Sequence, residues 1–205
     1  MNAATTQAIA IPDAIGAPFE GGFYGGLIRK HEVIYAVCWA PKALGEVQGA
    51  WLDRYESVPS AASCFDSDAN TKAMALAGSE LANKVLALEI DGVKGWSIPA
   101  RDVLELAYRH LKPTTEENSG SFRDGDNPSS VPAGYPYTDA TPLQTTVSAF
   151  QDGGAECFDE EWYWSSTQYS VNGAWNQTFN YGYQDYIIKS YEARARAVRL
   201  IQLSA

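Results

Sequence analysis

The N-terminal part of the chain carries the apolar pattern of β-strands. A Gly-rich extended stretch begins at Gly21 and reaches a Lys-His-Glu turn, and the β-branched and aromatic run from Val33 to Ala40 follows that turn. Two such runs flanking a short polar turn predict a β-hairpin. His31 lies at the tip of this hairpin, where we interpret it as a solvated turn residue rather than a catalytic one.

The middle of the chain carries helical patterns. Residues 70–88 predict one helix, because their apolar residues share one face at helical spacing. The residues after Pro99 predict a second helix that ends at Lys112, since proline is tolerated in a first helical turn. His110 lies near the C-terminus of this helix, where a charged imidazole would interact favourably with the helix dipole.

A long polar segment follows these helices. Residues 114–141 are rich in Ser, Gly, Pro, Asn and Asp and have no clear periodicity. So long an irregular segment inside a compact domain is usually functional or a packed loop. Thr141 and Gln144 then form a capping-box pattern around Pro142, which predicts a short third helix that closes at Gly153.

The C-terminal quarter alternates with the period of two that strands show. Trp175, Gln177 and Phe179 alternate with smaller residues, and residues 194–201 alternate in the same way. The order along the chain is a hairpin, then helices and a long loop, then several strands. This order predicts an α+β fold with antiparallel strands, two to three short helices and long loops.

Composition and charge exclude several classes of protein. The 205 residues are 45% hydrophobic and 20% charged, which is ordinary for one large globular domain. The net charge of −10 argues against nucleic acid and against a polybasic membrane contact, because those partners attract Lys and Arg. No run approaches the roughly 20 apolar residues of a membrane helix, so membrane insertion is not expected.

The N-terminal residues predict an extension rather than part of the core. Residues 1–17 are small, polar and interrupted by proline, so we expect an arm or linker ahead of a domain at 18–205. They lack the pattern of a signal peptide, so we expect synthesis in the cytoplasm.

An aromatic segment is the unusual feature of the composition. Residues 162–191 hold ten Phe, Trp or Tyr residues among thirty, and only Asp185 and Lys189 are charged there. Most other positions are Ser, Asn, Gln, Gly or Thr. Tyr among small polar residues is typical of antibody binding loops, where it supplies a large contact area at a low entropic cost. We therefore expect the Trp residues to pack in a core sheet and the Tyr residues to form a binding surface.

Several motifs taken together resemble a known family. They include Tyr-Trp-Ser-Ser-Thr-Gln at 163–168, Ala-Trp-Asn-Gln at 174–177 and Arg-Ala-Arg-Ala-Val-Arg at 194–199, with GGFYGGLIR and GWSIPARDVLEL upstream. The set resembles the variable proteins of diversity-generating retroelements, which have a C-type-lectin-like fold shared with the formylglycine-generating enzyme superfamily. The resemblance covers most of the chain.

This resemblance implies a function and a biological setting. It implies a non-catalytic protein that binds a protein or cell-surface ligand, either in a bacteriophage or prophage receptor-binding protein or as a bacterial variable protein. A virion-associated location is one expectation. Formation of a homo-oligomer, or attachment to a larger particle through the N-terminal arm, is another.

The resemblance also implies a diversified segment at about 164–199. In that family, error-prone reverse transcription replaces template adenines, which turns Asn codons of the form AAY into NNY. NNY codons can encode Tyr, Ser, Asn, Asp, Gly, Thr, Ile and Val, but never Trp, Gln, Glu, Lys or Met. Fifteen positions that fit this rule are the candidate variable, ligand-binding residues: Tyr169, Ser170, Val171, Asn172, Gly173, Thr178, Asn180, Tyr181, Tyr183, Asp185, Tyr186, Ile187, Ile188, Ser190 and Tyr191.

The interleaved positions are the candidate scaffold. Those that NNY codons cannot encode are Gln168, Trp175, Gln177, Gln184, Lys189 and Glu192. Those that fit the codon rule but belong to the scaffold by the motif are Ala174, Asn176, Phe179 and Gly182. For Ile187 and Ile188 two readings stay open: both form the hydrophobic centre of a contact patch, or both pack inward.

Two alternative functions also stay open. An activity like that of the formylglycine-generating enzymes would need a reactive cysteine pair at a copper site. Cys38, Cys64 and Cys157 are far apart in the sequence and lie in no recognisable active-site motif, so we expect structural thiols. A fixed-ligand, calcium-dependent lectin-like module could use the acidic clusters at 124–127 and 159–161, but turn formation explains both more simply. We therefore predict no catalytic residue, no metal site and no cofactor.

Overall fold

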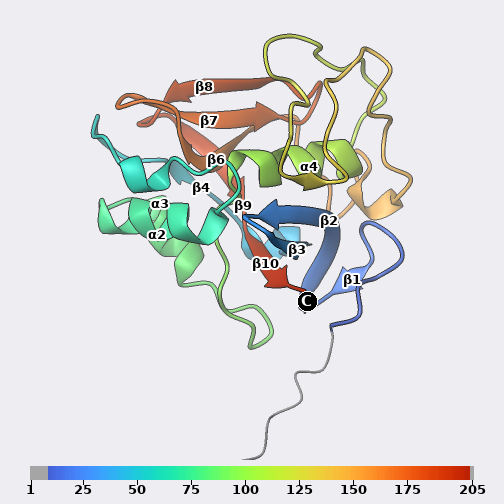
Figure 1. Ribbon diagram of the computed structural model, residues 1–205, viewed down its shortest axis with the longest axis horizontal. Coiled ribbons are helices and arrows are strands. Elements are labelled where there is room, and N and C mark those ends of the chain that lie inside the picture. The colour runs from blue at the N-terminus through green and yellow to red at the C-terminus, as the bar shows by residue number, and fades with distance from the viewer. Residues whose placement is uncertain (1–8, 204–205) are drawn as a thin grey trace, which may run out of the picture.

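The computed structural model describes residues 9–203, whose strands form two five-stranded sheets (Figure 1). The first sheet has the order β1-β2-β3-β10, with β5 also paired to β2. Its strands are β1 (Pro18–Phe19), β2 (Gly22–Lys30), β3 (Val33–Trp39), β5 (Ser130–Val131) and β10 (Val198–Gln202). The second sheet has the order β4-β9-β6-β7-β8. Its strands are β4 (Glu46–Ala50), β6 (Trp162–Gln168), β7 (Gly173–Thr178), β8 (Gln184–Ile188) and β9 (Glu192–Arg196).

The helices are few and short. They are α1 (Lys42–Gly45), α2 (Ser67–Leu76), α3 (Glu80–Leu86) and α4 (Arg101–Leu111), with 3₁₀ turns η1 (Pro59–Ala61) and η2 (Ser148–Phe150). The strand pairs of both sheets are antiparallel apart from the short parallel contact of β6 with β9. The α+β class with antiparallel strands, few helices and long loops is therefore confirmed.

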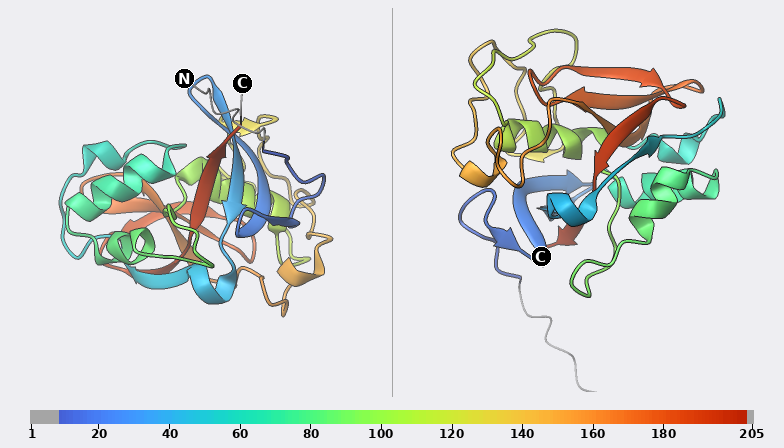
Figure 2. Two further views of the ribbon diagram at one scale, coloured as in Figure 1. Left: turned by 90° about the horizontal axis from the view of Figure 1, so that it is seen from below. Right: turned by 180° about the vertical axis from the view of Figure 1, so that it is seen from behind.

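Helix α4 is the centre of the molecule. It crosses between the two sheets, while α2 and α3 lie together at the other side of the second sheet (Figures 1 and 2). Nine of the eleven residues of α4 are buried, including Arg101, Asp102 and Glu105. Buried charges are costly unless they are paired. Here the Arg101 guanidinium contacts the Asp102 carboxylate at 2.9 Å, and Arg109 contacts Glu105 at 2.7 Å.

The N-terminal hairpin and the second predicted helix are confirmed. Pairing of Lys30 with Val33 leaves His31 and Glu32 as a two-residue turn between β2 and β3. His31 is exposed there and adopts a left-handed φ of 55°. The second helix is α4, and it ends one residue before Lys112.

The single helix predicted over residues 70–88 is wrong, because the chain divides it in two. Gly78 adopts φ +90°, a left-handed conformation that ends helices and that glycine adopts readily. Ser79 then caps α3, since its side chain accepts a hydrogen bond from the Ala82 backbone N–H at 3.2 Å. The apolar stripe continued across this break, and periodicity alone did not reveal it.

The third predicted helix is also wrong, because the capping-box residues bind elsewhere. Thr141 exchanges backbone hydrogen bonds with Thr138, and the Gln144 amide donates to the Pro113 carbonyl at 2.7 Å. The Thr145 backbone N–H donates to the Lys112 carbonyl at 2.9 Å. These contacts tie the segment to the end of α4 in an extended form, and only the 3₁₀ turn η2 follows.

The predicted strand at 194–201 divides between the two sheets. Ala197 lies between β9 of the second sheet and β10 of the first. Its backbone N–H donates to the Gly45 carbonyl at 2.8 Å, and its carbonyl accepts from the Ala40 N–H at 3.0 Å. One continuous alternating pattern therefore contains strands of both sheets. The chain passes from one sheet to the other at Ala197, whose position is fixed by hydrogen bonds to Ala40 before α1 and to Gly45 at the end of α1.

The segment predicted as an arm at 1–17 lies partly outside the described residues, which begin at 9. Within the described part, Ile11 and Ile15 are half-buried and pack against the core. The Gly16 backbone N–H also donates to the Tyr24 carbonyl at 2.7 Å. Residues 11–17 therefore contact β2 and the hydrophobic core. None of the helices found between residues 9 and 203 has the length and apolar character needed to cross a bilayer.

Candidate ligand-binding face

The aromatic segment forms an edge hairpin of the second sheet. Strand β7 pairs with β6 on one side and with β8 on the other, and β8 is the last strand of the sheet (Figure 1). In the β7–β8 register Trp175 lies opposite Tyr186, and Gln177 lies opposite Gln184. The backbone of β7 is thus held from both sides while β8 presents its outer edge.

Burial separates most of the candidate variable residues from most of the candidate scaffold. Thirteen of the fifteen candidate variable residues have accessible side chains, eight of them exposed and five half-buried. The exposed ones are Tyr169, Val171, Asn172, Tyr181, Tyr186, Ile188, Ser190 and Tyr191, and the half-buried ones are Ser170, Asn180, Tyr183, Asp185 and Ile187. The scaffold positions that are buried are Ala174, Trp175, Asn176, Gln177, Phe179, Gly182, Gln184 and Lys189.

Four positions depart from this division. Gly173 and Thr178 were assigned to the ligand-binding set, but both are buried at the two ends of β7. A Cβ at Gly173 would lie 3.2 Å from the Ile187 carbonyl oxygen. These two positions therefore offer no side chain to a ligand. Conversely, the scaffold residue Glu192 is exposed and Gln168 is half-buried.

Exposed aromatic rings on the hairpin pack against one another. Tyr169 stacks on Tyr186 with ring centroids 3.7 Å apart and planes 11° apart. The Tyr169 ring also meets the edge of Trp175 at 5.2 Å. Trp175 is 6% exposed and forms the floor beneath these two rings. Offset-stacked and edge-to-face pairs of this kind stabilise a defined side-chain arrangement.

Phe122 belongs to the same aromatic cluster and was not predicted from the sequence. Its ring stacks on Trp175 at 5.9 Å with planes 19° apart, and 69% of the residue is exposed. It lies in the long loop, outside the candidate variable segment. A lone Phe in the polar run Ser-Gly-Ser-Phe-Arg-Asp-Gly-Asp was the only signal available.

A groove of about 520 Å³ opens beside this cluster. It is lined by Ser170, Asn172, Gly173, Tyr186, Ile187, Ile188 and Tyr191, all of them candidate variable positions. The two isoleucines differ: Ile187 is half-buried against the hydrophobic core, whereas Ile188 is 51% exposed. The sequence left open whether the two isoleucines pack inward or belong to a contact patch. In the structure Ile187 packs inward, and Ile188 is accessible to a ligand.

Lys189 anchors the hairpin from below. Its ammonium donates to the Glu56 carbonyl and to Gln168 Oε1, both at 2.6 Å, and lies 4.6 Å from the Trp51 ring centroid. The Gln168 Oε1 atom also accepts from the Val58 backbone N–H. Burial of the ammonium lowers the pKa of Lys189 to about 8. This lysine joins the β8 end of the hairpin to the loop that follows β4.

The long loop anchors the other end of β8. The Asp124 carboxylate accepts from the Gln184 backbone N–H at 2.7 Å and from the Ser119 hydroxyl at 2.7 Å. Arg101 at the start of α4 donates to Gln184 Oε1 at 2.9 Å. Burial raises the pKa of Asp124 above the ordinary range of an aspartate, although these hydrogen bonds act to lower it. The loop and α4 therefore position the strand that carries Asp185 and Tyr186.

Residues of both acidic clusters considered for calcium are engaged within the fold. Asp124 is used as above, and Asn127 donates to the Asp102 carbonyl and to Glu105. Asp159 pairs with Lys42 at 2.5 Å and with Arg194 at 3.0 Å. Between residues 9 and 203, no group of three or more His, Cys, Asp or Glu side chains is arranged to hold a metal ion.

The three cysteines are free thiols in separate surroundings. Cys38 on β3 is buried and donates to the Phe19 carbonyl at 3.0 Å, and burial raises its pKa to about 12. Burial also raises the pKa of Cys64. A thiol needs a lowered pKa to react as thiolate. Cys157 is buried near the Lys42 ammonium, at 3.7 Å.

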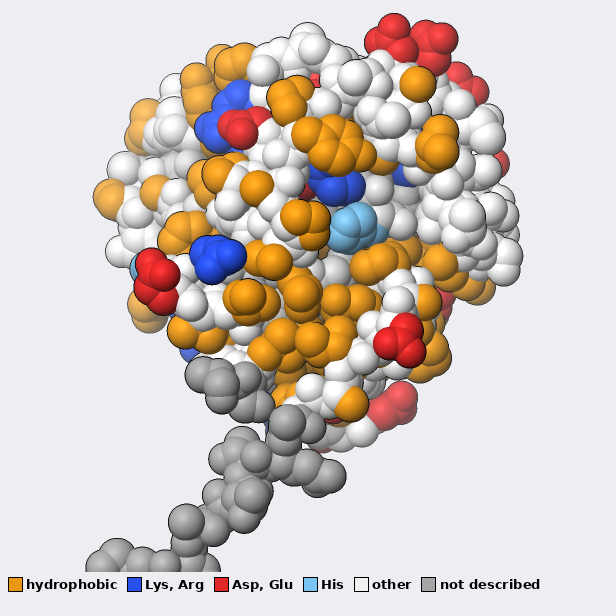
Figure 3. Space-filling view, turned by 45° about the vertical axis from the view of Figure 1, so that its right-hand side comes forward, with side chains coloured by type: hydrophobic (Ala, Val, Ile, Leu, Met, Phe, Trp, Pro, Cys, Tyr) orange, Lys and Arg blue, Asp and Glu red, His pale blue; other side chains and the backbone are white. Residues whose placement is uncertain are grey.

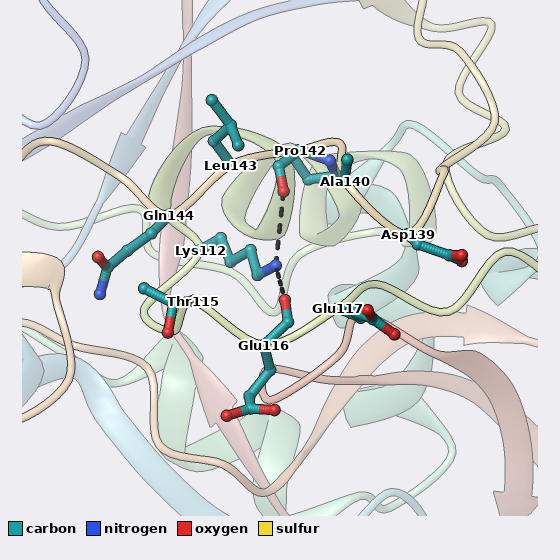
Figure 4. A pocket seen from close by; sticks show the side chains of 9 residues that line it. All are labelled: Lys112, Thr115, Glu116, Glu117, Asp139, Ala140, Pro142, Leu143 and Gln144. Atoms are coloured by element: carbon teal, nitrogen blue, oxygen red, sulfur yellow. Dashed lines mark hydrogen bonds between the residues drawn. The ribbon is translucent and has the colours of Figure 1, made fainter.

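Two further hollows lie on the long-loop side of the molecule. Figure 3 shows this side, where hydrophobic side chains gather over the lower half. One hollow of about 510 Å³ is lined in part by Ile15, His110 and Tyr135. The other, of about 410 Å³, has Lys112 in its floor (Figure 4). The Lys112 ammonium points to the carbonyls of Glu116 and Pro142, so its hydrogen bonds go to the loop backbone.

Comparison with known proteins finds no family model that matches the chain and no curated protein sequence that matches it.

Proposed function

We propose that this chain is a non-catalytic ligand-binding protein with a C-type-lectin-like fold. In this proposal the β7–β8 hairpin and its adjoining turns display side chains diversified by a retroelement, and the ligand is a protein or cell-surface receptor. The biological setting is a phage or prophage receptor-binding protein or a bacterial variable protein. The α+β architecture with antiparallel strands and long loops agrees with the fold that the sequence motifs imply.

One observation carries the proposal. The candidate variable positions, chosen by the codon rule together with the motif, are mostly accessible, and the residues interleaved with them are mostly buried and hydrogen-bonded. Neither the codon rule nor the motif uses coordinates, so the agreement of their combined assignment with burial supports the proposal. Most substitutions at exposed positions change stability by only about 0.5 kcal/mol, whereas buried ones cost far more. A hairpin of this kind can therefore change its surface without unfolding.

The physical mechanism of binding is surface complementarity. The exposed tyrosines supply area with few rotatable bonds, and Ser, Asn and Gly adapt around them. A standard protein interface buries about 800 Å² per partner. If several copies of the chain are joined on one particle, avidity would offset weak binding at a single face.

The proposal is tested first on DNA. The flanks of the encoding gene are sequenced and searched for a near-copy of the segment that encodes residues 164–199. A copy that differs only at template adenines, beside a reverse-transcriptase gene, would establish diversification, and its mismatches would identify the variable sites. Flanks without such a copy would contradict it, and a fixed-ligand or enzymatic function would become the better account.

A second experiment tests whether the accessible positions can vary without unfolding the protein. In one display library the thirteen accessible candidate positions are randomised with NNY codons; in a matched library the randomised positions are Trp175, Gln177, Phe179, Gly182, Gln184 and Lys189. We expect most members of the first library to resist protease as the parent does, and most members of the second to be cleaved. Equal loss of folding in both libraries would show that the face is structural rather than a display surface.

A further inference from the structure

A buried lysine lies against the side-chain amide of a glutamine at the base of the hairpin. Lys189 follows β8 directly and is fully buried, and Gln168 is the last residue of β6. The Lys189 Nζ atom is 2.6 Å from the Gln168 Oε1 atom. Because a C=O bond is about 1.23 Å long, Nζ is at most about 3.8 Å from the carboxamide carbon. This distance is close to the separation of about 3–3.5 Å from which aligned groups react.

The backbones of both residues are fixed by the sheet. The Lys189 backbone N–H donates to the Asn172 carbonyl at 2.9 Å, and the Lys189 carbonyl accepts from the Leu52 N–H at 3.2 Å. Gln168 pairs with Ala174 in the register of β6 with β7. The amine and the amide are therefore held together in one geometry, which replaces the chance encounter of two separate reactants.

The surroundings favour the amine as a nucleophile and the amide as its target. Among the described residues Lys189 makes no ion pair, and its ammonium donates to the Glu56 carbonyl and to Gln168. Burial lowers the pKa of Lys189 to about 8, so a larger fraction is neutral at pH 7 than in an exposed lysine. The Gln168 Oε1 atom also accepts from the Val58 backbone N–H at 2.6 Å. A donor at this oxygen stabilises the negative charge that develops there during attack.

We propose that Lys189 and Gln168 form an intramolecular isopeptide bond. The Lys189 ammonium gives one proton to the Glu56 carboxylate, whose charge acts on it, and the amine nitrogen attacks the carboxamide carbon. A C–N bond forms to Lys189 while the bond from that carbon to Gln168 Nε2 breaks. The attacking nitrogen loses a second proton, which leaves with Nε2 as ammonia. The ammonia takes the first proton from Glu56 and departs as ammonium, so no oxidant or reductant is needed.

The bond joins the two ends of the hairpin segment. Residues 169–188, between the joined side chains, hold thirteen of the fifteen candidate variable positions, and NNY codons encode neither Gln nor Lys. A covalent closure restricts the unfolded chain, so it stabilises the fold whatever side chains the segment carries. The bond does not depend on the display function, because both of its residues belong to the scaffold.

The intact mass of the folded, purified full chain tests the bond. We expect it to fall short of the sequence mass by one ammonia molecule, whereas Lys189→Met and Gln168→Met should have their full masses. Lys84→Arg and Gln48→Leu replace an exposed lysine and an exposed glutamine, so these control variants should keep the loss. A full sequence mass for the parent after prolonged incubation would overturn the proposal, as would a loss that persists in Lys189→Met.

Digestion with trypsin locates the bond. No Lys or Arg lies between Arg123 and Lys189, so an unmodified chain releases the peptide 124–189. Trypsin does not cleave after an acylated lysine, so we expect the peptide 124–194 instead, lighter by one ammonia molecule. A succinimide at Asn172 also forms with loss of ammonia, but it leaves Lys189 cleavable. Complete release of the peptide 124–189 would therefore overturn the proposal even if the intact mass were low.

Glu56→Gln tests the route of the proton. Soon after expression, before the parent reaction is complete, the rate of ammonia loss should be about tenfold lower or less than the parental rate, because the proton acceptor is gone. Asp53→Asn is the matched control, since Asp53 and Glu56 both pair with Arg54. This variant should react at the parental rate. An unchanged rate in Glu56→Gln would overturn the part of Glu56 in the reaction.

Discussion

Two segments of this protein have similar small polar residues and use them in opposite ways. The long loop at 113–147 and the hairpin segment at 168–191 are both rich in Ser, Asn and Gly. In the loop, Asn118 is buried, and its amide donates to the carbonyls of Thr138, Asp139 and Pro142. In the hairpin, Asn172 is exposed.

The difference follows from where the backbone finds its hydrogen bonds. Buried backbone groups must be paired, and in the hairpin strands β6, β7 and β8 pair them with one another. The accessible side chains there are therefore not needed to pair the backbone. The loop has few strand partners, so its side chains replace them, as when Asn127 Oδ1 accepts from the Ser130 N–H at 3.0 Å. Composition alone does not distinguish a packed loop from a display surface, whereas the source of backbone pairing does.

The largest expected effect on the free energy of unfolding comes from a glycine in the turn between β7 and β8. Gly182 lies between the accessible Tyr181 and Tyr183, adopts φ +75°, and a Cβ there would lie 2.2 Å from the Tyr108 ring. Gly182→Ala should therefore lower the free energy of unfolding by about 3 kcal/mol or more, since left-handed strain and overpacking add. Denaturant unfolding measures this.

The matched control for that substitution is Gly95→Ala. Gly95 has a similar φ of +86°, but a Cβ there would meet no atom within 4 Å. Only the conformational strain remains, so the loss should be about 1 kcal/mol. Equal losses for the two variants would mean that the Tyr108 contact does not fix the hairpin turn.

A smaller effect distinguishes the two asparagines. Asn127→Ala removes hydrogen bonds to the Asp102 carbonyl at 2.7 Å, to Glu105 at 2.6 Å and from Ser130. Because these partners stay buried and unpaired, we expect a loss of about 2–3 kcal/mol in the free energy of unfolding. Asn172→Ala on the exposed hairpin turn should change it by less than about 0.5 kcal/mol. Similar values for both would contradict the contrast between the two segments.

Much of the fold follows from local patterns in the sequence. The β2–β3 hairpin, α4 and β7 match their predicted positions, because each pattern is local and complete. The helix division at Gly78 was missed although its signals are local, because the apolar stripe continues past Gly78 and the capping Ser79. The crossing at Ala197 was missed because it depends on contacts with the distant Ala40 and Gly45. The helix predicted after Thr141 failed for the same reason: Gln144 bonds to Pro113 rather than to its own backbone.

The candidate site divides in a similar way. The codon rule and the motif together separated most accessible positions from most buried ones, since alternation along a strand is a local property. They could not find Phe122, whose place beside Trp175 depends on how the loop folds back over α4. Nor could they separate Ile187 from Ile188, because which neighbour faces the core depends on strand register.

The smallest expected effect is a change in how the free energy of unfolding depends on pH, caused by His110 on the long-loop side of the molecule. His110 lies in the last turn of α4 beneath the loop, and its Nδ1 lies 2.8 Å from the Gly25 carbonyl oxygen. Burial lowers the pKa of His110 below its ordinary value of 6.5, and nearby Arg109 lowers it further. The unfolded chain therefore takes up a proton that the folded chain resists, so the free energy of unfolding should fall as pH drops below about 6.5. The stability that neutral His110 contributes is present above that pH.

His110→Asn keeps a donor for Gly25 and removes the titration. The fall in its free energy of unfolding between pH 7 and pH 5 should therefore be smaller than that of the parent. His31→Asn, at the exposed turn with φ 55°, should retain the parental dependence. Identical pH profiles for the parent and His110→Asn would show that this histidine does not couple protonation to the stability of the loop side.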